Sequence, residues 1–285
     1  MRFLSLIVIV PLLLLAPVGI LAHPHIVDVG EKTEVSLESF LDDLRKVQVI
    51  FIGELHVHTG HHQAQLSIVK ALDDDERPLA IGLEMFRRDS QDALDAWSAN
   101  EMPFLKFMEV YKKNWSMAWS AYSEIFMYAR NQEVKMLGLN IPDNLSGKVA
   151  KNGFKSLSIK ERQLLGNVQC EVDSTYARYI RQAMGGYGGH GQQYLFFCEA
   201  QLLWDTVMAR NLIDFLKENQ DYRVVVMAGS AHAWKFGIPR QLVEQADISY
   251  RVVLPEVAGR GDRNSMTDEF ADYLWLDVGD DGWQF

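Results

Sequence analysis

Glutamate and histidine side chains stand at the ends of three apolar runs in this sequence. The run at residues 49–52 is followed by Glu54 and His56, a second run ends beside Glu84, and a third ends beside His232. Carboxylates and imidazoles carry protons in general acid–base catalysis, and both bind metal ions. These four residues are therefore the candidate catalytic residues, and Glu54, His56 and His232 are also candidate ligands of a divalent metal ion.

The placement of these four groups favours a functional cleft. Glu54 and His56 are two positions apart, so in an extended strand they point to the same side. Charges at the ends of apolar runs must be paired or bound, because burying an isolated charge is costly. The alternative is a structural network in which Glu–His hydrogen bonds hold loops together.

Further histidines crowd the segment after the first run. His58, His61 and His62 follow His56 closely, and neutral imidazole is a common metal ligand. Their spacing differs from the His-Glu-x-x-His pattern of zinc peptidase helices, so a ligand role for any of them is left open beside simple solvation. We expect His23 and His25 to belong to a solvated N-terminal tail.

The elements that position these residues follow from short apolar runs that alternate with segments of helical periodicity. Consecutive apolar positions are typical of strands buried on both faces, and their alternation with helices predicts a mainly parallel sheet. We expect strands at 47–52, 79–83, 134–139, 224–227, 250–254 and 273–278, and helices at 36–46, 63–73, 90–99, 117–131, 173–184, 192–217 and 239–246.

The predicted fold class is therefore α/β, with a mainly parallel sheet flanked by helices. No linker interrupts residues 23–285, which we expect to form one domain. Ligands of open parallel sheets bind outside the carboxyl ends of the strands, where the candidate residues stand. The segment 100–220 holds one expected strand, several helices and many aromatic residues, and predicts a helical lid layer beside the sheet.

The composition and the N-terminal segment limit the classes of function that this chain can have. A net charge of −10 argues against nucleic-acid partners and favours small ligands or proteins. Residues 1–22 carry one charge and a long apolar run, which predicts a signal peptide or a retained N-terminal anchor. We therefore expect an exported, periplasmic or membrane-associated protein that meets the membrane only through this segment. Whether Cys170 and Cys198 pair there is left open.

A glycine-rich stretch covers residues 185–191, where the sequence reads Gly-Gly-Tyr-Gly-Gly-His-Gly. It follows an expected helix, so it lacks the preceding strand of a phosphate-binding loop. We expect a mobile loop, and Tyr187 and His190 on it are candidate contacts of a ligand in the cleft.

Taken together, the motifs resemble those of the ChaN-like haem-binding uptake family of the Tiki and erythromycin-esterase superfamily. The resemblance runs from about residue 47 to 239, with the motifs in family order. It rests on Gly-Glu-Leu-His at 53–56 with His-His-Gln at 61–63, Gly-Leu-Glu-Met-Phe at 82–86, Glu-Ala-Gln-Leu-Leu-Trp-Asp at 199–205, and Gly-Ser-Ala-His at 229–232 before Gly-Ile-Pro at 237–239.

This resemblance implies an exported bacterial protein of haem or iron acquisition. In such a protein haem lies in a pocket formed with a second subunit, here a homodimer, and a tyrosine oxygen holds the iron. No motif fixes that tyrosine, so Tyr187 and Tyr194 are candidates by location, with His190 beside them. A porphyrin also needs an aromatic lining and a cation for its carboxylates, for which Lys235, Arg87 and Arg88 are candidates.

The wider superfamily includes hydrolases, so the resemblance also implies an alternative. A metal-dependent esterase or peptidase would use Glu54, His56, Glu84 and His232 on water or on a metal. The chain has Val57 where the family usually has Asp after the first motif, which weakens this alternative. The lipobox cysteine of some members is absent as well. Whether the chain turns over a substrate, or is an interaction module, is left open.

Overall fold

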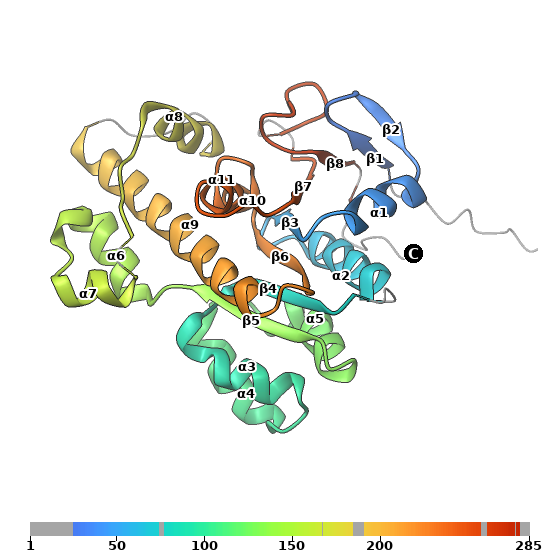
Figure 1. Cartoon of the computed structure of the whole chain (residues 1–285), viewed down its shortest axis with the longest axis horizontal. Coiled ribbons are helices and arrows are strands. Elements are labelled where there is room, and N and C mark those ends of the chain that lie inside the picture. The colour runs from blue at the N-terminus through green and yellow to red at the C-terminus, as the bar shows by residue number, and fades with distance from the viewer. Residues whose placement is uncertain are drawn as a thin grey trace, which may run out of the picture.

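An eight-stranded sheet forms the centre of the computed structural model, which describes residues 25–73, 77–166, 168–184, 191–257, 261–276 and 278–279. The strand order is β2-β1-β8-β7-β3-β6-β4-β5 (Figure 1). The strands are β1 (His25–Asp28), β2 (Thr33–Val35), β3 (Val49–Glu54), β4 (Leu79–Arg87), β5 (Lys135–Asn140), β6 (Arg223–Gly229), β7 (Tyr250–Pro255) and β8 (Tyr273–Leu276).

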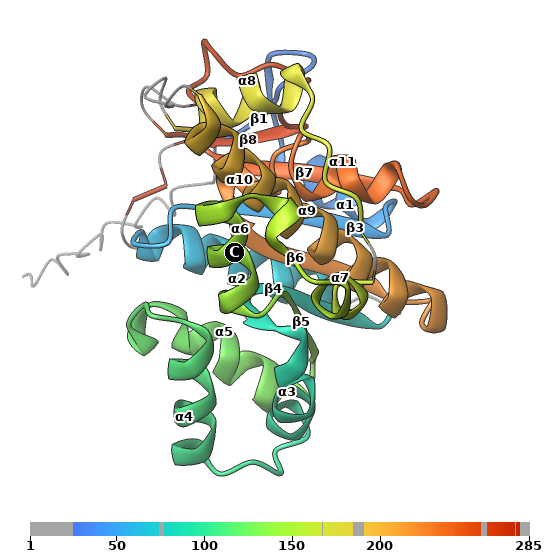
Figure 2. The same cartoon turned by 90° about the vertical axis from the view of Figure 1, so that its left-hand side faces the viewer.

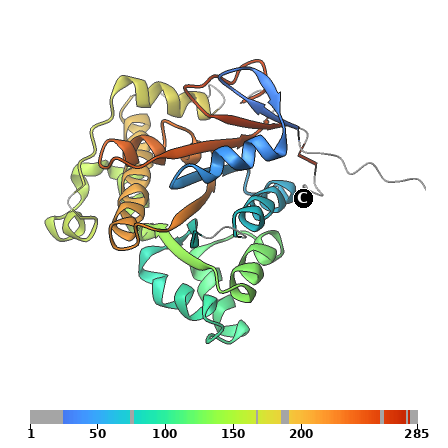
Figure 3. The same ribbon diagram turned by 45° about the vertical axis from the view of Figure 1, so that its right-hand side comes forward.

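The sheet is mainly parallel, as predicted. Every pairing among the strands from β8 to β5 in this order is parallel, and β1 is antiparallel to both β2 and β8. Figure 3 shows the blue β1–β2 pair beside the red C-terminal strand. The expectation of a solvated tail at His25 is wrong: the residue is exposed but begins β1, where it pairs with Leu276. His23 lies outside the described residues.

Helices cover both faces of the sheet. One core packs side chains of α1 to α5 against alternate positions of β3, β4 and β6, and the other packs α8 to α11 against the remaining positions. The helices are α1 (Leu37–Arg45), α2 (Thr59–Asp73), α3 (Gln91–Ser98), α4 (Phe104–Asn114), α5 (Trp119–Asn131), α6 (Asp143–Asn152), α7 (Ile159–Leu164), α8 (Ser174–Ala183), α9 (Gln192–Glu218), α10 (Ser230–Ala233) and α11 (Ile238–Val243).

The helices predicted for the segment 100–220 are present. The helices of this segment before β5 (α4 and α5) lie on one face of the sheet, and α8 and α9, which follow β5, lie on the other face. Figure 2 shows α3, α4 and α5 grouped together at one end of the molecule. Their aromatic side chains interlock, since the rings of Trp97 and Phe107 stack 4.0 Å apart and Trp119 stacks on Phe126 at 5.5 Å. Helices α6 and α7 form a third, smaller core with α9. The aromatic residues of this layer therefore serve mainly as core.

Candidate functional site

Three neighbouring strands bring the predicted site residues together. Glu54 at the end of β3 lies opposite Gly229 at the end of β6, and Glu84 comes from β4 on the other side of β6. The Gly229 amide donates to Glu84 Oε2 over 2.6 Å. His232 follows in α10, the single helical turn that begins directly after β6. The expectation that the four groups meet at the carboxyl ends of the strands agrees with this geometry.

Glu54 and His56 form the first carboxylate–imidazole pair. His56 Nδ1 lies 2.7 Å from Glu54 Oε1, and the Tyr122 hydroxyl donates to the same oxygen over 2.5 Å. Burial opposes ionisation of Glu54, but the hydrogen bonds and charges of His56 and His62 outweigh it and lower the pKa of this carboxyl. Burial likewise opposes a charge on His56, yet Glu54 and Glu84 raise its pKa overall.

His232 and Asp205 form the second pair. His232 Nδ1 lies 2.6 Å from Asp205 Oδ1, and the Tyr176 hydroxyl donates to Asp205 Oδ2 over 2.6 Å. On its other side, His232 Nε2 lies 3.8 Å from Glu84 Oε1. Burial opposes a charge on His232, but Glu84 and Asp205 raise its pKa to about 9. Both ring nitrogens of His232 therefore carry protons at neutral pH.

Sequence reasoning missed Asp205, Tyr176 and Tyr122 as members of this site. Asp205 is fully buried in the middle of α9, among apolar neighbours. A buried carboxylate needs a partner, so an acidic residue inside an apolar helical stretch was the available signal. The two tyrosines had no such signal, because they belong to aromatic-rich helices.

Gly229 separates the two pairs and permits their close approach. A Cβ atom at this position would lie 2.9 Å from His56 Cε1, 3.1 Å from His56 Nε2 and 3.6 Å from Glu84 Oε2. The His56 ring therefore occupies the space that any larger residue at position 229 would need.

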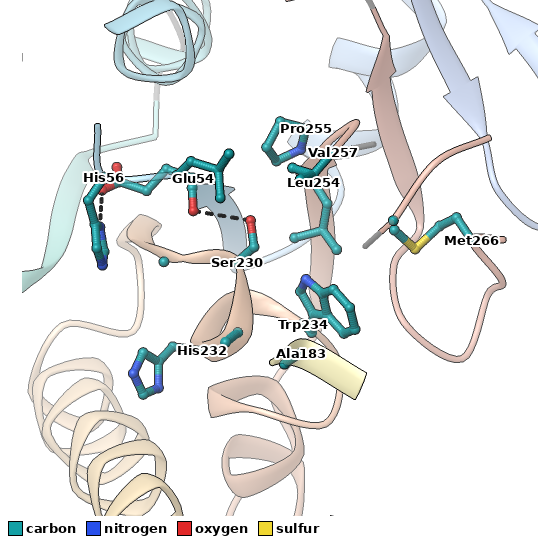
Figure 4. A pocket seen from close by; sticks show the side chains of 14 residues that line it. Glu54, His56, Ala183, Ser230, His232, Trp234, Leu254, Pro255, Val257 and Met266 are labelled. Carbon is teal, nitrogen blue, oxygen red and sulfur yellow. Dashed lines mark hydrogen bonds and ion pairs between the residues drawn. The ribbon is translucent and has the colours of Figure 1, made fainter. Parts of the chain in front are cut away.

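A cavity of about 240 Å³ opens beside these groups. Figure 4 shows Glu54, His56, Ser230 and His232 on one side and an apolar wall on the other. The wall includes Trp234, Leu254, Pro255, Val257 and Met266, and Ala183 at the end of α8 also lines the cavity. Glu84 stands behind the cavity lining and contacts it through Gly229 and His232.

The additional histidines of the first loop lie in the structure that supports the site. His61 Nδ1 accepts a hydrogen bond from the Leu55 amide over 3.0 Å, and its ring stacks on His58 at 4.0 Å. Burial and the neighbouring His58 lower the pKa of His61 to about 3, so it stays a neutral acceptor. His62 is buried against the Tyr122 ring, with Nε2 3.5 Å from Glu54 Oε2.

These donors do not fit a metal centre. Among the described residues, no group of three or more His, Cys, Asp or Glu side chains is arranged to hold a metal ion. The imidazole nitrogens nearest the carboxylates are engaged with them instead, as in the His232–Asp205 pair. The predicted metal ligands Glu54, His56 and His232 therefore meet in one site without forming a metal-binding set.

Four of the predicted haem-contacting residues, Tyr194, Lys235, Arg87 and Arg88, are described by the structure and do not line this cavity. Tyr194 lies on α9, where its hydroxyl donates to the Ala177 carbonyl and Arg181 lies over its ring. Lys235 pairs with Asp272 at 2.7 Å. Arg87 pairs with Asp89 at 3.3 Å, while its neighbour Arg88 is exposed.

Two further candidate ligand residues and the two cysteines complete the set of residues named from the sequence. Tyr187 and His190 lie outside the described residues. Cys170 and Cys198 are free thiols, and burial raises the pKa of Cys170 to about 12. Over the parts of the chain that the structure describes, each helix is too short or too polar to cross a membrane.

Comparison with solved structures shows which fold this is. ChaN of Campylobacter jejuni, solved with cofacial haem binding, aligns with a TM-score of 0.69 and 19% identity over 89% of this chain and 96% of that chain. An erythromycin esterase mutant in its open conformation aligns with a TM-score of 0.51 and 14% identity over 82% of this chain and 76% of that one. Both are similar to this chain in fold.

Sequence comparisons give one curated relative and one family. Protein RETICULATA-RELATED 5, chloroplastic, of Arabidopsis thaliana is 26% identical over 130 residues, which is 43% of this chain and 18% of that protein. The chain thus spans less than a fifth of the length of this relative. The profile of the family described as "Haem-binding uptake, Tiki superfamily, ChaN" matches residues 40–242. The chain belongs to this ChaN family of haem-binding uptake proteins.

Proposed function

We propose that this protein binds haem in the cavity at the carboxyl ends of β3, β6 and β7, as a step in haem uptake. The observation that carries the proposal is the two-sided lining of the cavity: an apolar wall faces a floor that carries an imidazole. A porphyrin is an apolar disc whose iron takes a nitrogen or oxygen donor, and ligand pockets combine mostly apolar walls with a few polar groups.

The residues present fit the apolar part of such a ligand. Trp234, Leu254 and Met266 are almost completely buried and still border the cavity, so an apolar ring placed there would be shielded from water on that side. The described lining contains no lysine or arginine, and the floor carries the Glu54 carboxylate. The haem carboxylates would therefore point out of the cavity.

The size of the cavity supports a second subunit. Its volume of about 240 Å³ is slightly below the roughly 300–1,000 Å³ of pockets that enclose drug-sized ligands. A porphyrin seated against the apolar wall would extend beyond the mouth and expose its other face. The similar ChaN structure of Campylobacter jejuni binds haem cofacially. We therefore propose a homodimer in which two haem-loaded mouths face each other.

The proposal also includes export of the protein from the cytoplasm. Residues 1–22 have the composition of a secretory signal or an N-terminal anchor, since they carry one charged side chain and a long apolar run. We propose a periplasmic or membrane-associated protein. N-terminal sequencing of the protein purified from a periplasmic extract tests this, with a new N-terminus near His23 as the expected result and an intact Met1 in a cytoplasmic fraction as the contrary one.

A metal-dependent hydrolase is the less favoured function. The cluster of Glu54, His56, Glu84 and His232 has the residue types for it, but these residues do not form a metal-binding set.

The direct test of haem binding is a haemin titration of the purified protein, followed by absorbance and by light scattering behind size-exclusion chromatography. We expect saturation at one haem per chain, together with a shift from monomer to dimer. Binding that does not saturate, with no change in size, would contradict the proposal.

A further inference from the structure

We infer that the two carboxylates of haem bind in a second cavity, which adjoins the haem cavity at Met266 and carries the cations of Lys32 and Arg263. The inference rests on the proposed function, because it requires haem in the first cavity. It deepens that function by assigning residues to the polar edge of the ligand, which the haem cavity itself leaves without a cation.

The second cavity combines an apolar floor with a basic edge. Its volume is about 220 Å³. Val27 of β1 and Leu274 of β8 are buried in its floor, whereas Lys32, in the turn between β1 and β2, and Arg263 are exposed at its edge. A haem propionate has the same two parts, namely a pair of methylene groups and a terminal carboxylate. The cavity therefore suits the arm of the ligand as well as its charge.

Met266 is the described residue that both cavity linings share. Figure 4 shows Met266 and His56 on opposite sides of the haem cavity. A Cβ atom on Gly261 would lie 2.7 Å from Met266 Cε, so the methionine methyl group packs against a residue that has no side chain. A methionine side chain is unbranched and adaptable, and so Met266 can make room for a propionate arm between the two cavities.

The two cations are available to an incoming anion. No hydrogen bond or ion pair joins Lys32 to another described residue. Arg263 pairs with Glu34 through Nη1 at 3.1 Å, and both side chains are 48% exposed. An ion pair this exposed is weak, and a guanidinium has further N–H donors for a second carboxylate. Because both haem carboxylates extend from one edge of the porphyrin, two neighbouring cations are what the ligand needs.

Arg178 is the alternative cation beside the site. This exposed arginine of α8 lines a different cavity, of about 400 Å³, whose lining also includes the Glu269 carboxylate. That cavity shares no described residue with the haem cavity. Arg178 therefore lacks a direct route to the ligand, and it serves as the matched control for Arg263.

Haemin and its dimethyl ester test the inference, because the ester keeps the porphyrin and the iron but lacks both negative charges. Each is titrated into the full-length protein and into the double variant Lys32→Gln/Arg263→Gln, and binding is followed by absorbance. We expect the unmodified protein to bind haemin about 10-fold more tightly than the ester, as for partly screened contacts between opposite charges. The double variant should bind haemin as weakly as the ester, with an unchanged affinity for the ester.

Two further variants separate charge from structure. Lys32→Arg/Arg263→Lys keeps both positive charges and should retain the preference for haemin. Arg178→Gln removes an exposed arginine elsewhere and should retain it too. Added salt should weaken haemin binding by the unmodified protein more than by Lys32→Gln/Arg263→Gln, because salt screens exposed charges.

The outcomes separate this inference from the proposed function. If the unmodified protein binds haemin and the ester equally, or the double glutamine variant keeps the preference for haemin, the carboxylates bind elsewhere although haem binding stands. Equal weakening of both ligands in that variant, or loss of the preference in Arg178→Gln, would also contradict the inference. If the unmodified protein binds neither compound saturably, the proposed function itself fails.

Discussion

At the scale of single residues, Gly229 is the position where the smallest change has the largest expected effect. Gly229→Ala adds one methyl group, which meets the His56 ring at 2.9 and 3.1 Å. The ring is held by Glu54, so relief requires breaking that contact or shifting β6. We expect a loss of about 1–3 kcal/mol in unfolding free energy, as for other overpacked sites, and weaker haem binding.

Denaturant unfolding of Gly229→Ala beside Gly147→Ala checks this expectation. Gly147 lies inside α6, and a Cβ atom there meets nothing within 4 Å. The control should be stabilised by roughly 0.5–1 kcal/mol, because alanine favours the helix. If Gly229→Ala is as stable as the unmodified protein and binds haem equally well, this result would contradict the close packing of the His56 ring against Gly229.

The raised pKa of His232 predicts that the stability of the folded protein depends on pH. Its pKa rises from 6.5 to about 9 on folding. A group whose pKa is raised stabilises the folded state fully below its unfolded pKa, and this contribution is lost as the pH rises through its folded pKa. The unmodified protein should therefore have a higher unfolding free energy than His232→Gln at pH 6.5. We expect this difference to fall by about 3 kcal/mol between pH 6.5 and 9. A constant difference across that range would contradict the paired, protonated state of His232.

The sequence allowed the glutamate and histidine residues of the site to be predicted, but not the tyrosine and aspartate residues that form hydrogen bonds with them. Glu54, His56 and His232 stand at the ends of apolar runs, and parallel strands bring such ends together. Tyr122 is 68 residues away from Glu54 along the chain, and Tyr176 reaches Asp205 across two helices. Only the packing of those helices places the tyrosines at the carboxylates, and no local pattern encodes it.

At the scale of elements, Tyr122 links α5 to the end of β3. Tyr122→Phe removes the hydroxyl that donates to Glu54 and leaves a buried carboxylate with one donor fewer. Burial and the Glu54 charge raise the pKa of Tyr122, so the hydroxyl remains a donor at all ordinary pH values. A hydrogen bond to a charged group contributes about 1.5–3 kcal/mol, and we expect a loss of that size in unfolding free energy, together with weaker haem binding.

Tyr111→Phe is the matched control for this link. Tyr111 is as buried as Tyr122, but its hydroxyl donates to the Met117 carbonyl over 3.1 Å, away from the site. Loss of a neutral hydrogen bond costs about 1 kcal/mol, and haem binding should stay unchanged. Equal effects of the two substitutions on haem affinity would mean that Tyr122 supports only the fold.

Element prediction succeeded where hydrophobic patterns were long and failed where elements were short or peripheral. The buried strands β3 to β8 and the helices α1, α2, α3, α5, α8, α9 and α11 were predicted near their observed bounds. The edge strands β1 and β2 are too short for a period of two to be visible, and α10 is a single turn. Helix α4 buries only Phe107 and Tyr111, and exposes Phe104 and Leu105, while α6 buries Leu145, Ser146 and Val149, so neither has a clear apolar periodicity.

At the scale of the whole molecule, one sheet connects the site to both cores. Neighbouring positions of β3 alternate between them, since Ile50 and Ile52 face α2 to α5 while Val49 and Phe51 face α9 and α11. The two carboxylate–imidazole pairs follow the same division: Glu54 is held from α5, and His232 is held from α9. The cavity thus lies where two independently packed helical layers meet over the ends of the strands.

The site of haem binding is tested most directly by filling the cavity. Ala183 lines it from the end of α8, and Gln182 beside it is exposed and does not. Haemin titrations of the unmodified protein, Ala183→Trp and Gln182→Trp, followed by absorbance, compare a blocked cavity with an open one. We expect saturable binding in the unmodified protein and in Gln182→Trp, and its loss in Ala183→Trp. Equal binding by all three proteins would show that haem binds elsewhere on this chain.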